Sequence, residues 1–173
     1  MENKTIVGID PDVDRSGYAV CVRRDWRTTC RAMSLTFDEL IMELSSLCKE
    51  EAVEVVIEAG WMNQKASWHT SPWEKANIAA KKGLAVGRNH QVAHDIASLC
   101  KALAIPYREV APLRKSWRGR DGKITEDELL YFCPLERRRD GHTHNQEERD
   151  AMLLAWVYAG GAVRVKPIQS TRK

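Results

Sequence analysis

Four acids stand at positions of this 173-residue chain where the surrounding pattern favours apolar side chains. Asp10 ends one β-prone, apolar run and Glu58 ends another. Glu147 and Asp150 lie at the start of a predicted helix, and because residues three apart share a helix face, both can point at one site. Carboxylates are the ligands that a hard cation such as Mg²⁺ prefers, so these acids predict a divalent-cation site if the fold brings them together.

Each acid also has an ordinary explanation. Asp10 precedes a proline and can simply start a turn, although an acid at the end of a buried strand, matched by Glu58, favours a functional role. Any acid in the first turn of a helix is stabilised by the helix dipole, so Glu147 needs no functional role to be where it is. Its neighbour Glu148 is equally well placed through a capping box. The sequence leaves open which of the two faces the site.

The strands that must position the acids are indicated by short runs of β-branched and apolar residues bounded by turn residues. The first three runs are joined by short connections, which is typical of an antiparallel meander. The fourth follows a helix, which favours a crossover to a parallel strand. The predicted strands cover residues 5–9, 17–22, 28–33, 53–57 and 105–110.

Helices are indicated by start signals and by apolar residues at three- and four-residue spacing. Pro72 at a first helical position predicts a helix over 72–82, and because Gly83 and Gly87 interrupt the pattern, a separate helix is predicted over 90–103. Three other helices begin with a capping box, in which the first side chain and a glutamate three residues later each satisfy a backbone N–H. These boxes are Thr36 with Glu39, Thr125 with Glu128, and Asn145 with Glu148.

This order of elements predicts an α/β fold, a mixed sheet flanked by helices, in a single domain over residues 1–173. The 43% apolar and 29% charged residues are those of an ordinary globular protein. No run of about 18 apolar residues indicates a membrane helix, and the N-terminus lacks the features of a secretory signal, so a cytoplasmic location is expected. The five cysteines are scattered without a CxxC pair, which favours buried, reduced thiols over zinc binding.

Basic residues are unevenly distributed, although the net charge of +3 is too small to indicate a nucleic-acid partner by itself. One cluster lies between Arg114 and Lys123, and the tail over residues 164–173 holds four basic residues and no acid. Both stretches can meet phosphates. A merely solvated basic loop explains any single one of these residues nearly as well.

Three motifs, in this order, resemble the RuvC family of Holliday junction resolvases, which lies within the RNase H-like nucleases. The first is IVGIDP from Ile6, followed by GYAV from Gly17; the second is VIE from Val56; the third is RDAMLLA from Arg149. Together they span almost the whole chain. The resemblance implies an RNase H-like fold and a nuclease activity.

For the acids, the resemblance implies that Asp10, Glu58 and Asp150 are catalytic metal ligands, with Glu147 at the family's fourth position. Two metal ions about 3.5 to 4 Å apart can activate a water and neutralise the charge that develops during phosphodiester cleavage. Four acids without a histidine or cysteine cage suit Mg²⁺, and Mn²⁺ should substitute. The sequence departs from the family at Asp12, where glycine is expected; extra negative charge there can adjust metal affinity or alter activity.

The resemblance also marks residues expected to contact DNA. Trp61 stands where the resolvases carry an aromatic side chain near the junction centre, and a core position is the alternative. Two lysines of the basic loop, Lys115 and Lys123, are expected to approach the scissile phosphate as part of the catalytic site. Backbone phosphates are expected to be held by Arg114, Lys115, Arg118 and Arg120.

The function that the resemblance implies is Mg²⁺-dependent resolution of four-way DNA junctions by paired nicks. Because such a junction has approximate two-fold symmetry, a homodimer is expected, and the helical stretch over 72–103 is a candidate dimer surface. Two alternatives stay open: an RNase H-like nuclease acting on RNA–DNA hybrids or flaps, and a branched-DNA-binding protein that does not cleave. Asp12, in place of the expected glycine, makes the second alternative credible.

Overall fold

A mixed five-stranded sheet is the centre of the fold. The computed structural model describes residues 4–63, 76–114, 116–138 and 140–165. The strand order is β3-β2-β1-β4-β5, in which β2 is antiparallel to both β1 and β3, while β4 is parallel to β1 and β5 is parallel to β4. The strands are β1 (Lys4–Asp10), β2 (Ser16–Arg23), β3 (Thr28–Leu35), β4 (Val53–Glu58) and β5 (Tyr107–Val110).

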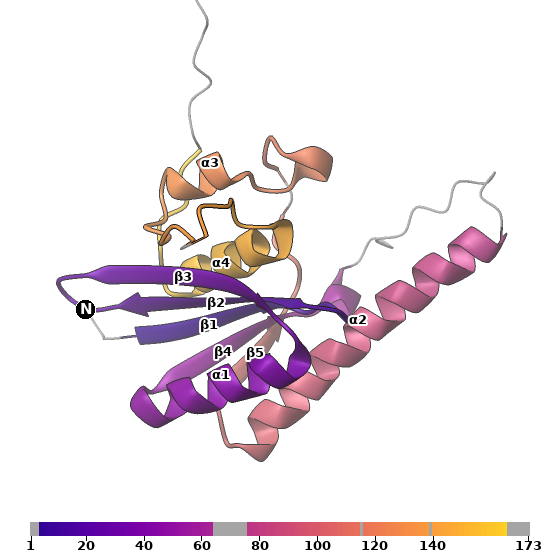
Figure 1. Ribbon diagram of the computed structural model, residues 1–173, viewed down its shortest axis with the longest axis horizontal. Helices are drawn as coiled ribbons and strands as arrows, with labels where there is room; N and C mark the ends of the chain where they lie inside the picture. The colour runs from indigo at the N-terminus through magenta and orange to yellow at the C-terminus, as the bar shows by residue number, and fades with distance from the viewer. Residues whose placement is uncertain (1–3, 64–75, 115, 139, 166–173) are drawn as a thin grey trace, which may run out of the picture.

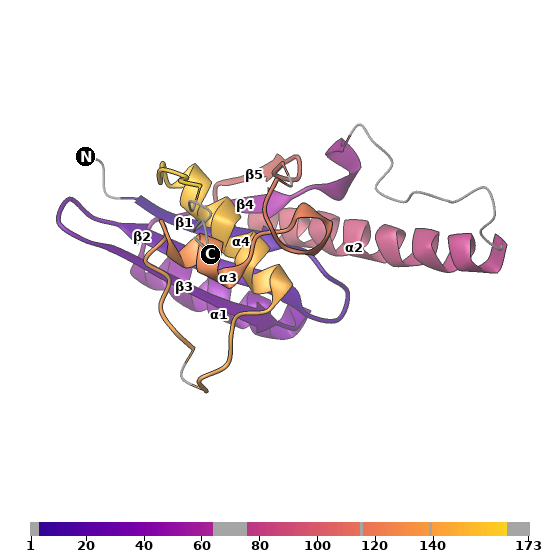
Figure 2. The ribbon, with the colours of Figure 1, turned by 90° about the horizontal axis from the view of Figure 1, so that it is seen from above.

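Helices cover both faces of the sheet (Figures 1 and 2). On one face lie α1 (Phe37–Glu50) and α2 (Ala76–Ala102), and on the other lie α3 (Glu126–Leu130) and α4 (Gln146–Tyr158). Two short 3-10 helices, η1 (Gly60–Met62) and η2 (Arg120–Gly122), lie in the connections. The expected α/β architecture, a mixed sheet flanked by helices, is confirmed.

The alternation of side chains along the central strands divides the core into two layers. In β1, Ile6 packs into the cluster on the α4 side, whereas Val7 and Ile9 pack into the cluster on the α1 and α2 side. In β4, Val56 faces α4 and Ile57 faces α1 and α2. The next residue after Ile9 and the next after Ile57 therefore both face α4.

The capping boxes predicted for α1, α3 and α4 are all present, with both hydrogen bonds of each box formed. The prediction of two helices separated at Gly83 and Gly87 is wrong, because α2 runs without interruption through both glycines. A glycine inside a helix costs only about 1 kcal/mol relative to alanine, which the rest of a long helix offsets. The backbone around Gly87 consequently lies within the helix. The predicted start at Pro72 lies outside the described residues.

Only the C-terminal half of α2 packs on the sheet. Its buried residues are Ala93, Ile96, Ala97 and Cys100, and from Ala76 to Val92 no residue is buried. Figure 1 shows this part of α2 projecting beyond the edge of the other elements. Apart from Asn89, His90 and Val92, which contact other elements, the projecting half is therefore a helix surface that the rest of the described chain leaves uncovered.

The cysteines are free thiols, as predicted, and all but Cys48 are buried. No helix in the described part of the chain has the length and apolar character needed to cross a membrane. Of the basic tail predicted from residue 164, only Arg164 and Val165 belong to the described residues.

Candidate active site

Asp10 and Glu58 end neighbouring strands at the same level of the sheet. Ile9 pairs with Ile57 in the parallel ladder between β1 and β4, so the residues that follow them lie side by side on strands about 4.8 Å apart. Both follow a residue that faces α1 and α2, and strand alternation turns both toward α4. The sheet thus places two carboxylates next to each other beneath the helix that carries Glu147 and Asp150.

Two glycines let α4 lie directly against the sheet. A Cβ on Gly8 would clash with the carbonyl oxygen of Ala151 and lie 2.7 Å from the backbone nitrogen of Ala155. A Cβ on Gly17 would clash with the carbonyl oxygen of Glu147. Gly17 pairs with Asp10 across β1 and β2, so this contact brings the first turn of α4 to the level of Asp10.

The electrostatics around Asp10 show that the four predicted acids are neighbours. The pKa of Asp10 is raised well above its ordinary value, first by burial and then by the negative charges of Glu58, Asp150 and Glu147. The positive charge of Lys123 acts in the opposite direction. Residues from β1, β4 and α4, up to 140 positions apart in the sequence, therefore form one acid cluster, defined here as Asp10, Glu58, Glu147 and Asp150.

Asp150 is held by two neighbours. The Nε2 of Gln146 donates to Asp150 Oδ1 at 2.8 Å, and Lys123 Nζ lies 3.7 Å from Asp150 Oδ2. Because Gln146 is one turn before Asp150 on α4, the helix itself fixes this carboxylate. Lys123, predicted to belong to the catalytic site, thus lies beside one of the acids and provides a positive charge within the acid cluster.

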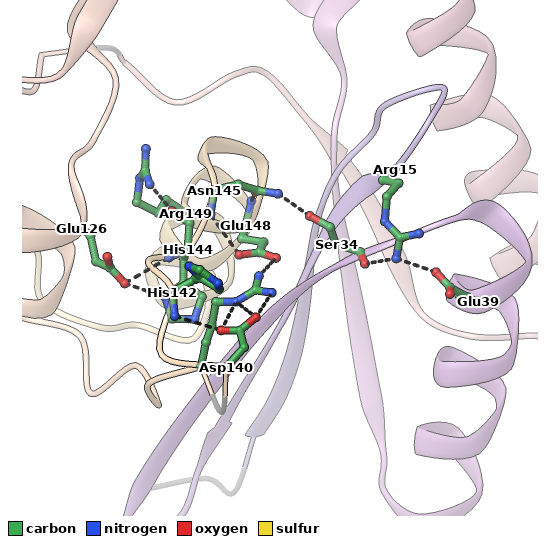
Figure 3. Close-up of polar contacts among 11 residues, drawn as sticks. Arg15, Ser34, Glu39, Glu126, Asp140, His142, His144, Asn145, Glu148 and Arg149 are labelled. Carbon is green, nitrogen blue, oxygen red and sulfur yellow. Dashed lines mark hydrogen bonds and ion pairs between the residues drawn. The ribbon is translucent and has the colours of Figure 1, made fainter.

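Glu148 lies among residues of the loop that precedes α4, beside Asp140 and Asn145 (Figure 3). Its side chain is fully buried, and it accepts from Arg138 Nη1 at 2.6 Å and from the backbone N–H of Asn145 at 3.0 Å. Arg138 is held in turn by Asp140, with two N–O distances of 3.1 Å and one of 2.6 Å. Glu148 is therefore committed to fixing the start of α4, and Glu147 is the residue whose charge reaches Asp10.

A cavity of about 180 Å³ opens beside Asp10 and Glu58. Its other walls come from η1 and from α2, which contributes Asn89 and His90. Glu58 also lines a smaller pocket together with Lys123 and Asp150. Asp10 and Glu58 are thus accessible from a hollow that α2 also lines, a helix in which no catalytic residue is predicted.

Trp61 does not stand free beside this cavity. Its ring stacks on His94, with centroids 4.1 Å apart, and meets the edge of His90 at 5.5 Å. It packs against the core cluster on the α2 side. The alternative that Trp61 is a packing residue is therefore supported, and a contact of Trp61 with DNA stays a prediction.

The basic loop places its arginines in different surroundings. Arg114 is exposed and lines the pocket that holds Glu58 and Asp150. Arg118 donates through its Nε to the buried carboxylate of Glu128 at 3.1 Å, so it helps to fold the loop. Arg120 has a side chain that is 96% exposed. Lys115, predicted for both catalysis and DNA contact, lies outside the described residues.

The donor set suits a hard divalent cation, because the acid cluster offers carboxylate oxygens and its mutual repulsion already raises the pKa of Asp10. As the side chains stand, no group of three or more His, Cys, Asp or Glu residues in the described ranges is arranged to hold a metal ion. His144 is buried, and its Nδ1 lies 2.8 Å from Glu126 Oε1.

No family model matches the chain, and no curated protein matches it. Among solved structures it is similar to Thermus thermophilus RuvC in complex with a Holliday junction substrate, at 16% identity and a TM-score of 0.48, over 90% of this chain and 93% of the other. A second structure of Thermus thermophilus RuvC matches at 16% identity and a TM-score of 0.41, over 95% and 99%. The yeast mitochondrial Holliday junction resolvase Ydc2 matches at 12% identity and a TM-score of 0.48, over 88% and 78%. At these identities the likeness is one of fold.

Proposed function

We propose that this chain is a divalent-cation-dependent endonuclease, RuvC-like within the RNase H-like nucleases, that resolves four-way DNA junctions by paired nicks. The observation that carries the proposal is the acid cluster. Three carboxylates from β4 and α4 lie around that of Asp10, and burial together with their negative charges raises its pKa. Carboxylates so close together lower the free energy of unfolding, so a purely structural role does not favour them. A metal-dependent enzyme uses them as ligands of the cation.

The residues of the acid cluster would hold the cation, with Mg²⁺ as the expected ion and Mn²⁺ as its substitute. When bound, a pair of such ions supplies an activated water and neutralises charge on the phosphate that is cut. Lys123, beside Asp150, is placed to attract the same phosphate toward the acids. Arg114 and Arg120, both exposed, are placed to contact flanking phosphates, which position the substrate without reading its sequence.

A homodimer would satisfy the two-fold symmetry of a four-way junction, because each subunit then cuts one of two opposed strands. The projecting half of α2 supports this part of the proposal, since it offers an uncovered helix next to the cavity that Asp10 lines. The protein is proposed to act on DNA in the cytoplasm. Sedimentation with and without junction DNA would measure whether the complex holds two copies of the chain.

The test uses end-labelled synthetic junctions with Mg²⁺, Mn²⁺ or EDTA. Wild type is expected to give symmetric nicks with either metal, and Asp10→Asn, which keeps the shape of the side chain, is expected to bind the junction without cutting it. Glu51→Gln is the matched control, because Glu51 lies at the opposite end of the same sheet and its loss leaves the acid cluster intact. A variant Asp10→Asn that cuts as well as wild type would overturn the proposal.

Parallel substrates decide between the proposal and its two alternatives. Cleavage of RNA–DNA hybrids or flaps in preference to junctions would assign the same acids to an RNase H-like activity on those substrates. Binding of junctions in EDTA, with no product in any divalent metal, would assign the chain to non-cleaving DNA-binding proteins. Either result replaces the junction-resolving function.

A further inference from the structure

The loop that follows Asp10 is fastened to α2 by a pair of side chains far apart in the sequence. Asn89 Oδ1 accepts the backbone N–H of Val13 at 3.0 Å, and Asn89 Nδ2 donates to Asp12 Oδ2 at 3.1 Å. The other carboxylate oxygen of Asp12 accepts the backbone N–H of Asp14 at 2.9 Å. One carboxylate thus folds the loop on itself and joins it to the helix. We call these contacts of Asp12 and Asn89 the latch.

Both sides of the latch adjoin the acid cluster. Asp12 is separated from Asp10 only by Pro11, whose ring fixes its φ angle, so a shift at Asp12 is passed to the strand end. Asn89 lines the same cavity as Asp10 and Glu58. It also lies just before Ala93, the first buried residue of α2, where the helix leaves the sheet.

The latch accounts for the departure from the family pattern at Asp12. A glycine there has no side chain to accept from Asn89 or to turn the loop. The extra carboxylate of Asp12 is engaged by an amide and by the backbone of its own loop. Asp12 therefore has a structural use beside the acid cluster that does not require it to bind a cation.

We propose that Asn89 is a positioning residue for Asp10: through the latch it holds the loop after β1 against α2, and thereby sets how tightly the acid cluster binds a divalent cation. This inference rests on the proposed function. The latch acts on metal affinity and on the rate of cleavage, because it contacts the Asp10 loop. Junction affinity in the absence of metal is governed by other residues.

A side-chain exchange tests the latch. Asn89→Asp places a carboxylate where the amide met Asp12, so two like charges face each other about 3 Å apart and the loop is pushed from α2. Asp12→Asn, added to Asn89→Asp, restores an amide-to-carboxylate contact in the reverse direction. In that double variant the N–H group of Val13 can still donate to a side-chain oxygen at position 89, and that of Asp14 to a side-chain oxygen at position 12. Asp14→Asn is the matched control for the Asp12→Asn part of the exchange, since it removes the same charge from the same loop without touching Asn89.

The measurements are Mn²⁺ binding to the full chain, read from the signal of free Mn²⁺, and junction affinity in EDTA. Loss of a residue that orients a metal ligand lowers metal affinity by about 10- to 100-fold, and that loss is expected for Asn89→Asp. The double variant should recover most of it, and Asp14→Asn should stay near wild type. Junction affinity in EDTA should be the same for all of these proteins, and circular dichroism should show each of them folded.

The outcomes separate the latch from the proposed function. Wild type that binds Mn²⁺ and cuts junctions, with Asn89→Asp equal to it in Mn²⁺ affinity, would overturn the latch alone. A double variant no better than Asn89→Asp would also overturn it, because restored pairing would then have no effect. A wild-type chain that neither binds Mn²⁺ nor cuts junctions would overturn the proposed function and this role of Asn89 with it.

Discussion

The two ends of the central sheet carry acids in opposite electrostatic situations. Near the start of β4, Glu51 accepts a hydrogen bond from Thr5 and pairs with Arg24 at 2.9 Å, and these contacts hold its pKa below the ordinary value. Glu54 in the same region lies between Lys4, at 3.4 Å, and Arg108. At the other end of β1, Asp10 is surrounded by three further acids and its pKa is raised.

The comparison separates acids that stabilise the fold from acids that oppose it. Glu51 and Glu54 each have a positive partner, so their charges favour the folded state. In the acid cluster, Lys123 is the positive group that lowers the pKa of Asp10, and burial together with three carboxylates outweighs it. A group of like charges at the end of a central strand lowers the stability of the folded chain, and such groups are found more often at functional sites than elsewhere.

Gly17→Ala should have the largest effect on stability and on Mn²⁺ binding. It would separate α4, which carries Glu147 and Asp150, from the strands that carry Asp10 and Glu58. The added methyl group would meet the backbone of Glu147 and push α4 from the sheet. Overpacking of this kind costs about 3 kcal/mol or more, and the melting temperature and Mn²⁺ binding should fall together. Gly87→Ala is the control, since a Cβ there meets nothing within 4 Å and a helical alanine should stabilise the chain slightly. Equal melting temperatures for the two variants would contradict the close contact of α4 with β2.

Addition of Mn²⁺ should stabilise the wild-type chain by joining the acids that repel one another. A ligand at a hundred times its Kd adds about 2.7 kcal/mol to the free energy of unfolding. Thermal unfolding at increasing Mn²⁺ measures this gain, and Asp10→Asn should reduce it strongly, whereas Glu51→Gln should retain it. A gain of equal size in Asp10→Asn would place the cation elsewhere in the molecule.

Asp10→Asn should make the protein more stable when no divalent cation is present. Because the folded-state pKa of Asp10 is raised, its contribution to stability is full below the ordinary pKa of 3.8 and is lost as the pH rises through the raised value. Asp10→Asn does not lose this stability. Its free energy of unfolding should therefore exceed that of wild type by an amount that grows from acid to neutral pH. Melting temperatures in EDTA across this range measure it, at about 2–4 °C per kcal/mol for a chain of this size. A variant less stable than wild type at pH 7 would contradict the raised pKa.

Glu51→Gln should have the smallest effect and the opposite sign. A partly exposed charged pair contributes about 1 kcal/mol at most, and the substitution should lower stability by that order at neutral pH. Since the pKa of Glu51 is lowered, its contribution is present above the ordinary value of 4.5 and is lost as the pH falls through the lower folded value. Wild type and variant should therefore converge in acid. Urea unfolding curves at pH 7 and pH 3 measure the difference in free energy of unfolding between wild type and Glu51→Gln. A difference of the same size at both pH values would exclude the charge of Glu51 as its cause.

Features that depend on local sequence were predictable. The acids Asp10 and Glu58 were recognised as strand ends because apolar alternation stops there, and the caps of α1, α3 and α4 follow from pairs of residues three apart. The family resemblance then indicated which acids belong together. These signals lie within a few residues of each other, where periodicity and hydrogen-bonding preferences act directly.

Features that depend on distant contacts were not predictable. Asn89 meets Asp12 across 77 positions, and the ring of His94 covers Trp61 from another element, so neither pairing leaves a pattern in the sequence. The continuous helix through Gly87 was missed because glycine has a low intrinsic helix propensity, which packing of the same helix further along overrides. The bond of Arg118 to buried Glu128 depends on how the loop folds, so no pattern in the sequence indicates it.

The position of β1 at the centre of the sheet has a consequence for how the site fails on heating. Its amides bond to β2 on one side and β4 on the other, so they should exchange with solvent hydrogen only on global opening. Glu147 lies in the first turn of α4, whose start is held by the capping box and by the pair of Glu148 with Arg138. These contacts involve the loop before α4, where Arg138 and Asp140 are partly exposed, so they should open before the central strand does. Warming should therefore detach one carboxylate of the acid cluster from a scaffold that is otherwise still folded, and Mn²⁺ binding should weaken several degrees before the sheet melts.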